Sequence, residues 1–150
     1  MPEPTCPLCG PLLTPIIEEG PDWRVALNLN QNLLGKCIIV LHRHEEDVTR
    51  LSAEEWGELH NLLGRTTARL RGTFQPEHFN YAFLQNQDRH VHLHVIPRYA
   101  AMRRFEGLAF EDPDYPGHYA VPTQFRQLTG EQMAALAASL QWVQPSASRR

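Results

Sequence analysis

The sequence lacks the features that mark several large classes of protein. Its 150 residues contain no uninterrupted apolar run near the roughly 18 residues that a membrane-spanning helix requires. The N-terminus, which begins Met1-Pro-Glu-Pro-Thr, does not show the basic and then apolar order of a secretory signal peptide. We therefore expect a soluble, cytoplasmic protein without a membrane partner.

Positive charge is not in excess, and there is no glycine-rich phosphate loop. The formal net charge is -3 at pH 7, so the chain offers no broad basic surface for an extended nucleic acid. No glycine pattern of the Walker or dinucleotide-binding type is present. A small nucleotide could still bind, but side chains and strand-end amides would have to hold its phosphates.

Cysteine is scarce, and its number and spacing are informative. The chain has 3 cysteines, an odd number that disfavours a structural disulfide, and Cys6 and Cys9 form a Cys-x-x-Cys pair. Two thiolates in a turn-rich segment can converge on one tetrahedral zinc ion. A redox pair and two idle cysteines are the alternatives, but Pro11 and Pro15 follow where a redox motif would have a helix. Zinc would need two more ligands, which histidines within 42–44 and 90–94 can supply.

Histidine, by contrast, is concentrated in one short segment. His90, His92 and His94 alternate with valine and leucine, which is the period of a half-buried β-strand. On such a strand neighbouring histidines lie about 7 Å apart and the outer two about 13 Å apart. A neighbouring pair can therefore flank one phosphate or hold one metal ion, whereas one ion held by all three is disfavoured. A merely solvated histidine face is the remaining alternative.

Three further strands and two helices follow from the sequence pattern. Alternating or β-branched runs predict strands at residues 23–28, 36–41 and 79–84. A capping box of Ser52 with Glu55 begins a long amphipathic helix that extends to about residue 71. A second capping box begins a helix that runs from residue 131 to about residue 142. The pattern alone predicts a mixed α and β protein.

The chain has the size of one domain. With 42% hydrophobic residues it can bury about two thirds of its unfolded surface in a single core. We expect that core to lie within residues 1–144 and residues 145–150 to form a disordered tail. The passage 100–128 shows no periodicity, which predicts an irregular functional flap or a subunit-contacting loop.

The run His-Val-His-Leu-His-Val-Ile resembles the pattern that gives the histidine triad (HIT) family of nucleotide hydrolases and transferases its name. The residues that follow it, Pro97-Arg98-Tyr99, are similar to those of the diadenosine polyphosphate hydrolase branch. The resemblance implies an α+β fold, the HIT-like fold, with an antiparallel sheet of about five strands, one long helix and a C-terminal helix. It also implies a homodimer in which the sheet is extended across the subunits.

The resemblance also implies a metal site and a substrate site. Zinc-carrying members place their four ligands at the positions of Cys6, Cys9, His44 and His90. Four protein ligands leave no open position, so this Zn(2+) would be structural. The residues implied for substrate binding are Asn28 at the ribose, Asn86 at a phosphate and Gln87 in place of the usual hydroxyl residue. Lys36 stands where many members of the family have a histidine.

The chemistry that the resemblance implies centres on the middle histidine. An imidazole with a pKa near 6.5 is neutral enough at pH 7 to attack phosphorus. By resemblance His92 is the nucleophile that forms a nucleotidyl-histidine at the α-phosphate, and His94 contacts the phosphate. The expected substrate is a dinucleoside polyphosphate or a nucleoside phosphoramidate. A nucleotide-binding module without turnover and a zinc-dependent hydrolase with the triad histidines as metal ligands are the alternatives.

Overall fold

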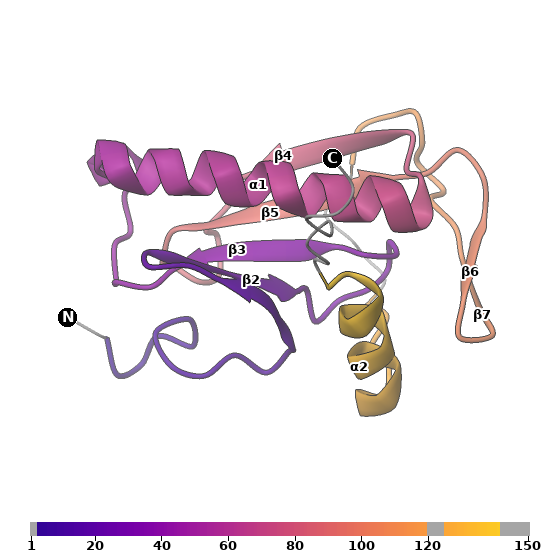
Figure 1. Cartoon of the computed structure of the whole chain (residues 1–150), viewed down its shortest axis with the longest axis horizontal. Coiled ribbons are helices and arrows are strands. Elements are labelled where there is room, and N and C mark those ends of the chain that lie inside the picture. The colour runs from indigo at the N-terminus through magenta and orange to yellow at the C-terminus, as the bar shows by residue number, and fades with distance from the viewer. Residues whose placement is uncertain (1–2, 120–124, 142–150) are drawn as a thin grey trace, which may run out of the picture.

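The computed structural model describes residues 3–119 and 125–141, which build a five-stranded antiparallel sheet with one long helix across it. The sheet order is β1-β2-β3-β5-β4. Its strands are β1 (Ile16–Glu19), β2 (Trp23–Leu27), β3 (Cys37–Leu41), β4 (His78–Ala82) and β5 (His92–Arg98). The predicted α+β fold with five antiparallel strands is confirmed, and the histidine strand β5 lies between β3 and β4 (Figure 1).

The long helix α1 (Ala53–Phe74) covers one face of the sheet (Figure 1). It begins with the predicted capping box, in which the Ser52 hydroxyl accepts from the Glu55 amide and the Glu55 carboxylate accepts from the Ser52 amide. Its apolar stripe packs on the strand residues that point toward it. The resulting core includes Leu59, Leu62 and Leu70 of α1 and Leu93 and Val95 of β5.

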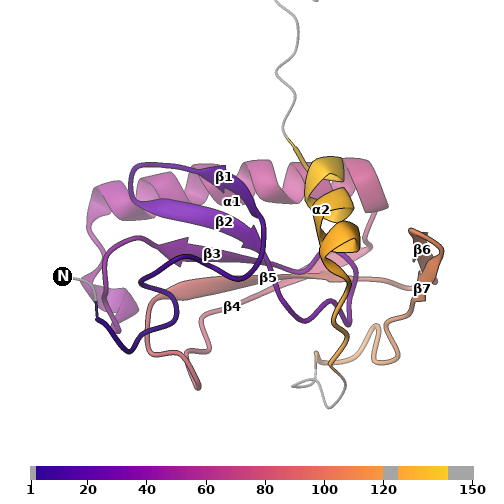
Figure 2. The same cartoon turned by 90° about the horizontal axis from the view of Figure 1, so that it is seen from below.

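The opposite face of the sheet is partly covered by the N-terminal segment, which crosses in front of the strands in Figure 2, with α1 behind them. Arg24 of β2 fixes this segment, because its guanidinium donates to the carbonyl oxygens of Leu8 at 2.8 Å and Gly10 at 2.7 Å. Since side chains alternate along a strand, His92 and His94 project to this second face while Leu93 and Val95 enter the core. The sheet therefore separates the histidine pair from α1.

The connection between β2 and β3 is held by a buried amide. The Gln31 side chain donates to the carbonyl oxygens of Asn28 and Lys36 and accepts from the backbone amide of Gly35. Gly35 has φ +88°, a left-handed conformation that glycine adopts without strain. A Cβ at this position would lie 2.7 Å from Leu70 Cδ2 of α1. The turn that leads into β3 thus depends on glycine for two independent reasons.

Several boundaries differ from the sequence prediction. The sequence pattern does not predict β1, because Ile-Ile-Glu-Glu does not alternate and lies between Pro15 and Gly20. The passage 100–128 is not wholly irregular, since it contains a hairpin of β6 (Arg103–Phe105) and β7 (Leu108–Phe110). Its three-residue strands are too short to show a period.

The C-terminal helix α2 (Gly130–Ser139) begins with the predicted capping box and packs beside β1. Its predicted end at residue 142 and the predicted tail at 145–150 lie outside the described residues, as does the domain boundary at 144. A short 3-10 helix, η1 (Val48–Arg50), precedes α1. In the described parts of the chain, the helices are too short or too polar to cross a membrane.

We predict that Gly35→Ala will lower the free energy of unfolding by about 1 to 3 kcal/mol, because alanine is strained at positive φ and its methyl group would displace Leu70. Urea denaturation monitored by tryptophan fluorescence would measure the change. Gly64→Ala is the control, since a Cβ on Gly64 of α1 would meet no atom within 4 Å and alanine favours the helix. Equal stability of Gly35→Ala and the wild type would contradict this role of Gly35.

Candidate functional site

The four residues implied as metal ligands lie together at one end of the sheet. Cys6 and Cys9 come from the N-terminal segment, His44 from the loop after β3 and His90 from the segment just before β5. One ligand atom from each residue forms a group in which all atoms lie within 4.8 Å of one another. The Sγ atom of Cys6 is 3.4 Å from His90 Nδ1, and that of Cys9 is 3.3 Å from His44 Nδ1 and 3.6 Å from His90 Nδ1.

These separations fit a tetrahedral zinc ion. With Zn–S and Zn–N bonds of about 2.3 and 2.0 Å, a sulfur and a nitrogen ligand on one ion are about 3.5 Å apart. The observed separations of 3.3 to 3.6 Å agree with that value. Two thiolates and two imidazoles complete the coordination shell, which suits a structural ion because no position remains for water.

The outer nitrogen of each histidine in this cluster has its own acceptor. His90 Nε2 is 2.6 Å from the carbonyl oxygen of Leu41, and His44 Nε2 is 3.3 Å from a carboxylate oxygen of Glu46. A carbonyl oxygen accepts and cannot donate, so Nε2 of His90 carries the proton and Nδ1 is left to coordinate. Burial opposes ionisation of Cys9, but hydrogen bonds from the Glu3 amide and from His44 outweigh it and lower the pKa of this thiol.

His92 has one ring nitrogen fixed and the other free. Its Nδ1 lies 2.6 Å from the backbone carbonyl oxygen of His90, which can only accept, so Nδ1 carries the proton. Among the described residues Nε2 of His92 has no hydrogen-bond partner, and the side chain is 6% exposed. His92 is absent from the metal cluster. This arrangement leaves the Nε2 lone pair available for attack on an electrophile.

His94 lies beside His92 on the same face. The two ring centroids are 4.8 Å apart, with the ring planes inclined by 64°. Burial lowers the pKa of His94 to about 4, and the charges of His92 and Lys36 act in the same direction. The imidazole of His94 is therefore neutral at pH 7, and it can donate one hydrogen bond or accept one.

The expectation of three imidazoles in one row is wrong for His90. β5 begins at His92, and the chain bends before it. The backbone amide of His90 donates to the carbonyl oxygen of Asp88, and that of Val91 donates to the carbonyl oxygen of Glu45. The His90 ring consequently turns toward His44, at a centroid distance of 5.2 Å. The triad is thus divided into one residue of the metal cluster and one pair on the sheet.

The residues implied for substrate binding come from two separate segments of the chain. Asn28 is half-buried at the end of β2, where its side-chain oxygen accepts from the Asn30 amide. Asn86 and Gln87 are exposed in the loop between β4 and β5, without hydrogen bonds to other described residues. Gln85 anchors this loop by donating to the Glu46 carbonyl oxygen at 2.6 Å. The roles of Asn28, Asn86 and Gln87 remain predictions.

Two residues after the triad have structural partners that sequence reasoning missed. Arg98 is 2% exposed and forms a two-point ion pair with Asp112, with separations of 2.7 and 3.2 Å. The hydroxyl of Tyr99 donates to the Leu34 carbonyl oxygen at 2.6 Å. Both contacts span long sequence separations, so no local pattern could have revealed them. The run Pro97-Arg98-Tyr99 therefore serves the fold, and it gives no direct information on the substrate.

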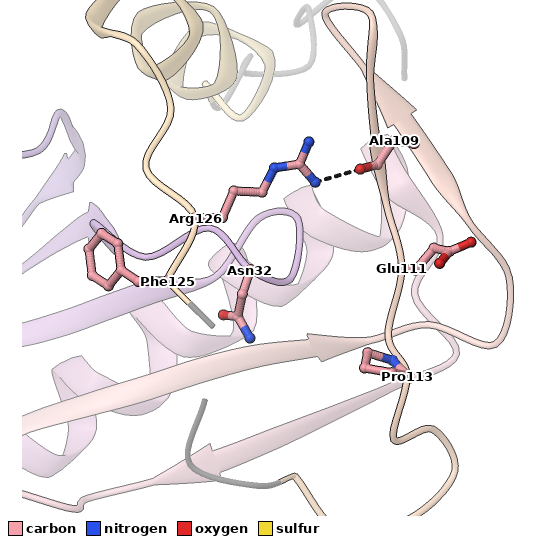
Figure 3. A pocket seen from close by; sticks show the side chains of 6 residues that line it. All are labelled: Asn32, Ala109, Glu111, Pro113, Phe125 and Arg126. Atoms are coloured by element: carbon pink, nitrogen blue, oxygen red, sulfur yellow. Dashed lines mark hydrogen bonds between the residues drawn. The ribbon is translucent and has the colours of Figure 1, made fainter. Parts of the chain in front are cut away.

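A large open hollow has neither His92 nor His94 in its lining (Figure 3). Its volume is about 810 Å³, and its lining consists of Asn32, Ala109, Glu111, Pro113, Phe125 and Arg126. The guanidinium of Arg126 donates to the Ala109 carbonyl oxygen and lies 4.1 Å from the centre of the Phe110 ring, so this cation already has partners. The lining of the hollow contains no histidine or cysteine, so the histidine pair is the candidate site.

Comparison of the sequence with protein-family models and with curated proteins yields no match. Solved structures, in contrast, are similar over most of the chain. A histidine triad protein from Bradyrhizobium japonicum is 18% identical, with a TM-score of 0.69, over 85% of this chain and 87% of that one. A histidine triad protein from Marinobacter aquaeolei VT8 is 25% identical, with a TM-score of 0.64, over 85% of this chain and 86% of that one.

A third similar structure is that of a zinc-bound histidine triad family protein from Mycobacterium smegmatis. It is 21% identical, with a TM-score of 0.59, and the match covers 91% of this chain and 93% of that one. The chain therefore has the fold of the histidine triad proteins. The cluster of two cysteines and two histidines in this chain is itself a set of ligands that suits zinc.

We predict that Cys9→Ser will lower the melting temperature by on the order of 10 °C and abolish binding of one zinc ion per chain, because a ligand that stabilises the folded state is lost. Metal analysis and differential scanning calorimetry would measure both effects. Cys37→Ser is the matched control, because Cys37 is a buried thiol outside the cluster. Full zinc content in Cys9→Ser would rule out this ligand set.

Proposed function

We propose that the chain is a histidine triad family enzyme that hydrolyses or transfers a nucleoside monophosphate. The observation that carries this proposal is the hydrogen bond from Nδ1 of His92 to the His90 carbonyl oxygen, which in the neutral ring places the proton on Nδ1 and leaves the Nε2 lone pair without a partner among the described residues. The fold of the similar structures supports the same assignment.

The proposed reaction has two steps at the α-phosphorus. In the first, the Nε2 lone pair of His92 forms a P–N bond, and the bond from phosphorus to the leaving oxygen or nitrogen breaks with its electron pair. The leaving group then takes a proton from water. In the second step, water attacks phosphorus and releases one proton to solvent, and the P–N bond breaks with its electron pair returning to Nε2. The nucleoside monophosphate is released and neutral His92 is regenerated. His94 lies beside His92 and, as a neutral imidazole, can donate to a phosphoryl oxygen.

The proposed substrate is a dinucleoside polyphosphate, such as diadenosine tetraphosphate, or a nucleoside phosphoramidate. The proposed Zn(2+) at Cys6, Cys9, His44 and His90 is structural and takes no part in either step. When bound, it would hold the N-terminal segment to the loops that flank β3 and β5. A zinc hydrolase that uses His92 as a ligand is the weaker candidate, because the cluster of possible metal ligands among the described residues consists of Cys6, Cys9, His44 and His90 and does not include His92. The free thiols and the proposed nucleotide chemistry suit the cytoplasm.

We predict that His92→Ala will lower turnover of diadenosine tetraphosphate by roughly 10⁴-fold or more, because the nucleophile is removed, while AMP binding stays within a few-fold of the wild type. Intact-mass measurement after brief exposure to the substrate should detect one added adenylyl group on the wild type and none on the variant. His60→Ala is the control, because His60 is an exposed residue of α1, which lies on the opposite face of the sheet from His92. Binding of AMP without any covalent adduct or turnover in the wild type would favour the binding-module alternative.

We also propose that two copies of the chain form a homodimer through β4 and α1. β4 is an edge strand, and apolar side chains surround it: Tyr81 is 47% exposed, Leu84 46% and Trp56 of α1 43%. Trp56 contacts Phe83 edge to face, which makes one continuous apolar surface. An edge strand beside such a surface is suited to pairing with a second copy about a two-fold axis.

Tyr81→Glu should convert the dimer to a monomer, because it places a charge at the centre of this surface. Size-exclusion chromatography with light scattering would measure the mass, with Leu13→Glu as the control, since Leu13 is 90% exposed on the N-terminal segment. A wild-type protein that is monomeric at high micromolar concentration would refute the dimer.

A further inference from the structure

Lys36 is the only lysine in the chain, whose other basic side chains are arginines and histidines. It is also buried, with 3% of its surface exposed. A lysine side chain normally keeps its ammonium group in water, and complete burial without a charged partner costs several kcal/mol. The placement of Lys36 therefore needs a specific explanation.

The sheet places Lys36 on the histidine face. Lys36 immediately precedes β3, so its side chain projects to the same side as that of Ile38, which pairs directly with His94 of β5. Its carbonyl oxygen accepts from the Asn28 amide, which continues the ladder between β2 and β3 by one residue. Lys36 is therefore the cross-strand neighbour of Asn28. Along the chain it lies two residues, about 7 Å, from Ile38, which is the residue that pairs with His94.

The partners of the Lys36 ammonium group are neutral. Nζ donates to the Asn32 side-chain oxygen at 2.7 Å and to the Tyr119 hydroxyl at 3.1 Å. Within residues 3–119 and 125–141 no carboxylate forms an ion pair with it, and these two acceptors leave one of its three hydrogens for a further partner. Arg98, the other buried cation near Tyr119, differs because Asp112 neutralises it.

The electrostatics of this region favour an incoming anion. Burial lowers the pKa of Lys36 to about 8, so the ammonium form still dominates at pH 7. The charged and titratable groups around it are His94, Tyr119 and the Arg98–Asp112 pair, and none of these supplies an unpaired negative charge. A bound anion would offset the cost of burying the cation, and a charge-assisted hydrogen bond would form in the process.

We propose that Lys36 binds a phosphate oxygen of a nucleoside 5′-monophosphate group, between Asn28 on the ribose side and His94 on the side of the nucleophile. This inference rests on the proposed function and adds a specific residue to it. Phosphate binding would explain why a lysine occupies a buried position. In the proposed site Lys36 supplies a positive charge, His94 is a neutral imidazole and His92 is the nucleophile.

Calorimetric titration of AMP and of adenosine tests the proposal, because the two ligands differ only in the phosphate. Lys36→Gln should weaken AMP binding about 10- to 100-fold, as expected for loss of a charge-assisted hydrogen bond, and leave adenosine binding within about twofold. Lys36→Arg, which keeps the charge, should retain more AMP affinity than Lys36→Gln. Arg71→Gln is the matched control, since it removes one positive charge from α1 on the far side of the sheet.

Three outcomes would count against the proposal. Unchanged AMP affinity in Lys36→Gln would overturn the role of Lys36 and leave the nucleophile assignment intact. Equal weakening of AMP and adenosine would show that Lys36 merely supports the loop, which also overturns it. Failure of the wild-type protein to bind AMP would remove the proposed function itself, and the role of Lys36 with it.

A measurement on the wild-type protein avoids any folding defect of the variants. Because the chain has a single lysine, protein labelled with ¹³Cε-lysine gives one lysine resonance. AMP should shift this resonance and raise the pKa that it reports, whereas adenosine should do neither. Identical titration curves with and without AMP would overturn the proposal.

Discussion

The site depends on the two different bonds made by residue 90. The side chain of His90 lies in the cysteine and histidine cluster, with its outer nitrogen held by the Leu41 carbonyl oxygen. Its backbone carbonyl accepts from Nδ1 of His92 and thereby fixes the tautomer of that ring. A residue that is held through its side chain also fixes its own carbonyl group, so the cluster and the ring of His92 are positioned by the same residue.

The alternation of side chains along the strands determines which charged and titratable residues lie on the same face of the sheet as His92. The same alternation that sends Leu93 into the core brings His92 and His94 to the opposite face. Burial keeps His94 neutral, while the one lysine of the chain retains its positive charge on the same face. Arg98 is buried nearby but is neutralised by Asp112, so its charge is used within the fold. Lys36 is thus a cation without a carboxylate partner among the described residues, and it lies on the same face as the two imidazoles.

Local patterns predicted the parts of this structure that local forces determine. The capping box at Ser52 and the β-branched run of β3 appear as predicted, because helix-end hydrogen bonding and side-chain branching act within a few residues. The four clustered ligands followed from the family resemblance, since spacing alone left the choice among the histidines open. The rest depends on contacts between distant residues. A hydrogen bond from Val91 to Glu45 sets the bend before β5, and Tyr119, 83 positions further along the chain, sets the environment of Lys36. A pattern over a few residues cannot contain such contacts.

The hydrogen bonds from Arg24 to the N-terminal segment would affect how fast a metal ion leaves the cysteine and histidine cluster. Because its guanidinium donates to the carbonyl oxygens of Leu8 and Gly10, the cysteine turn would stay beside the two histidines even if one bond to a bound metal ion broke. A dissociated thiolate would then remain at a high effective concentration near the ion, so that rebinding of the ion would compete with its release. An ion held in this way would exchange slowly with free metal, at a rate that the arginine tether sets together with the strength of the individual bonds.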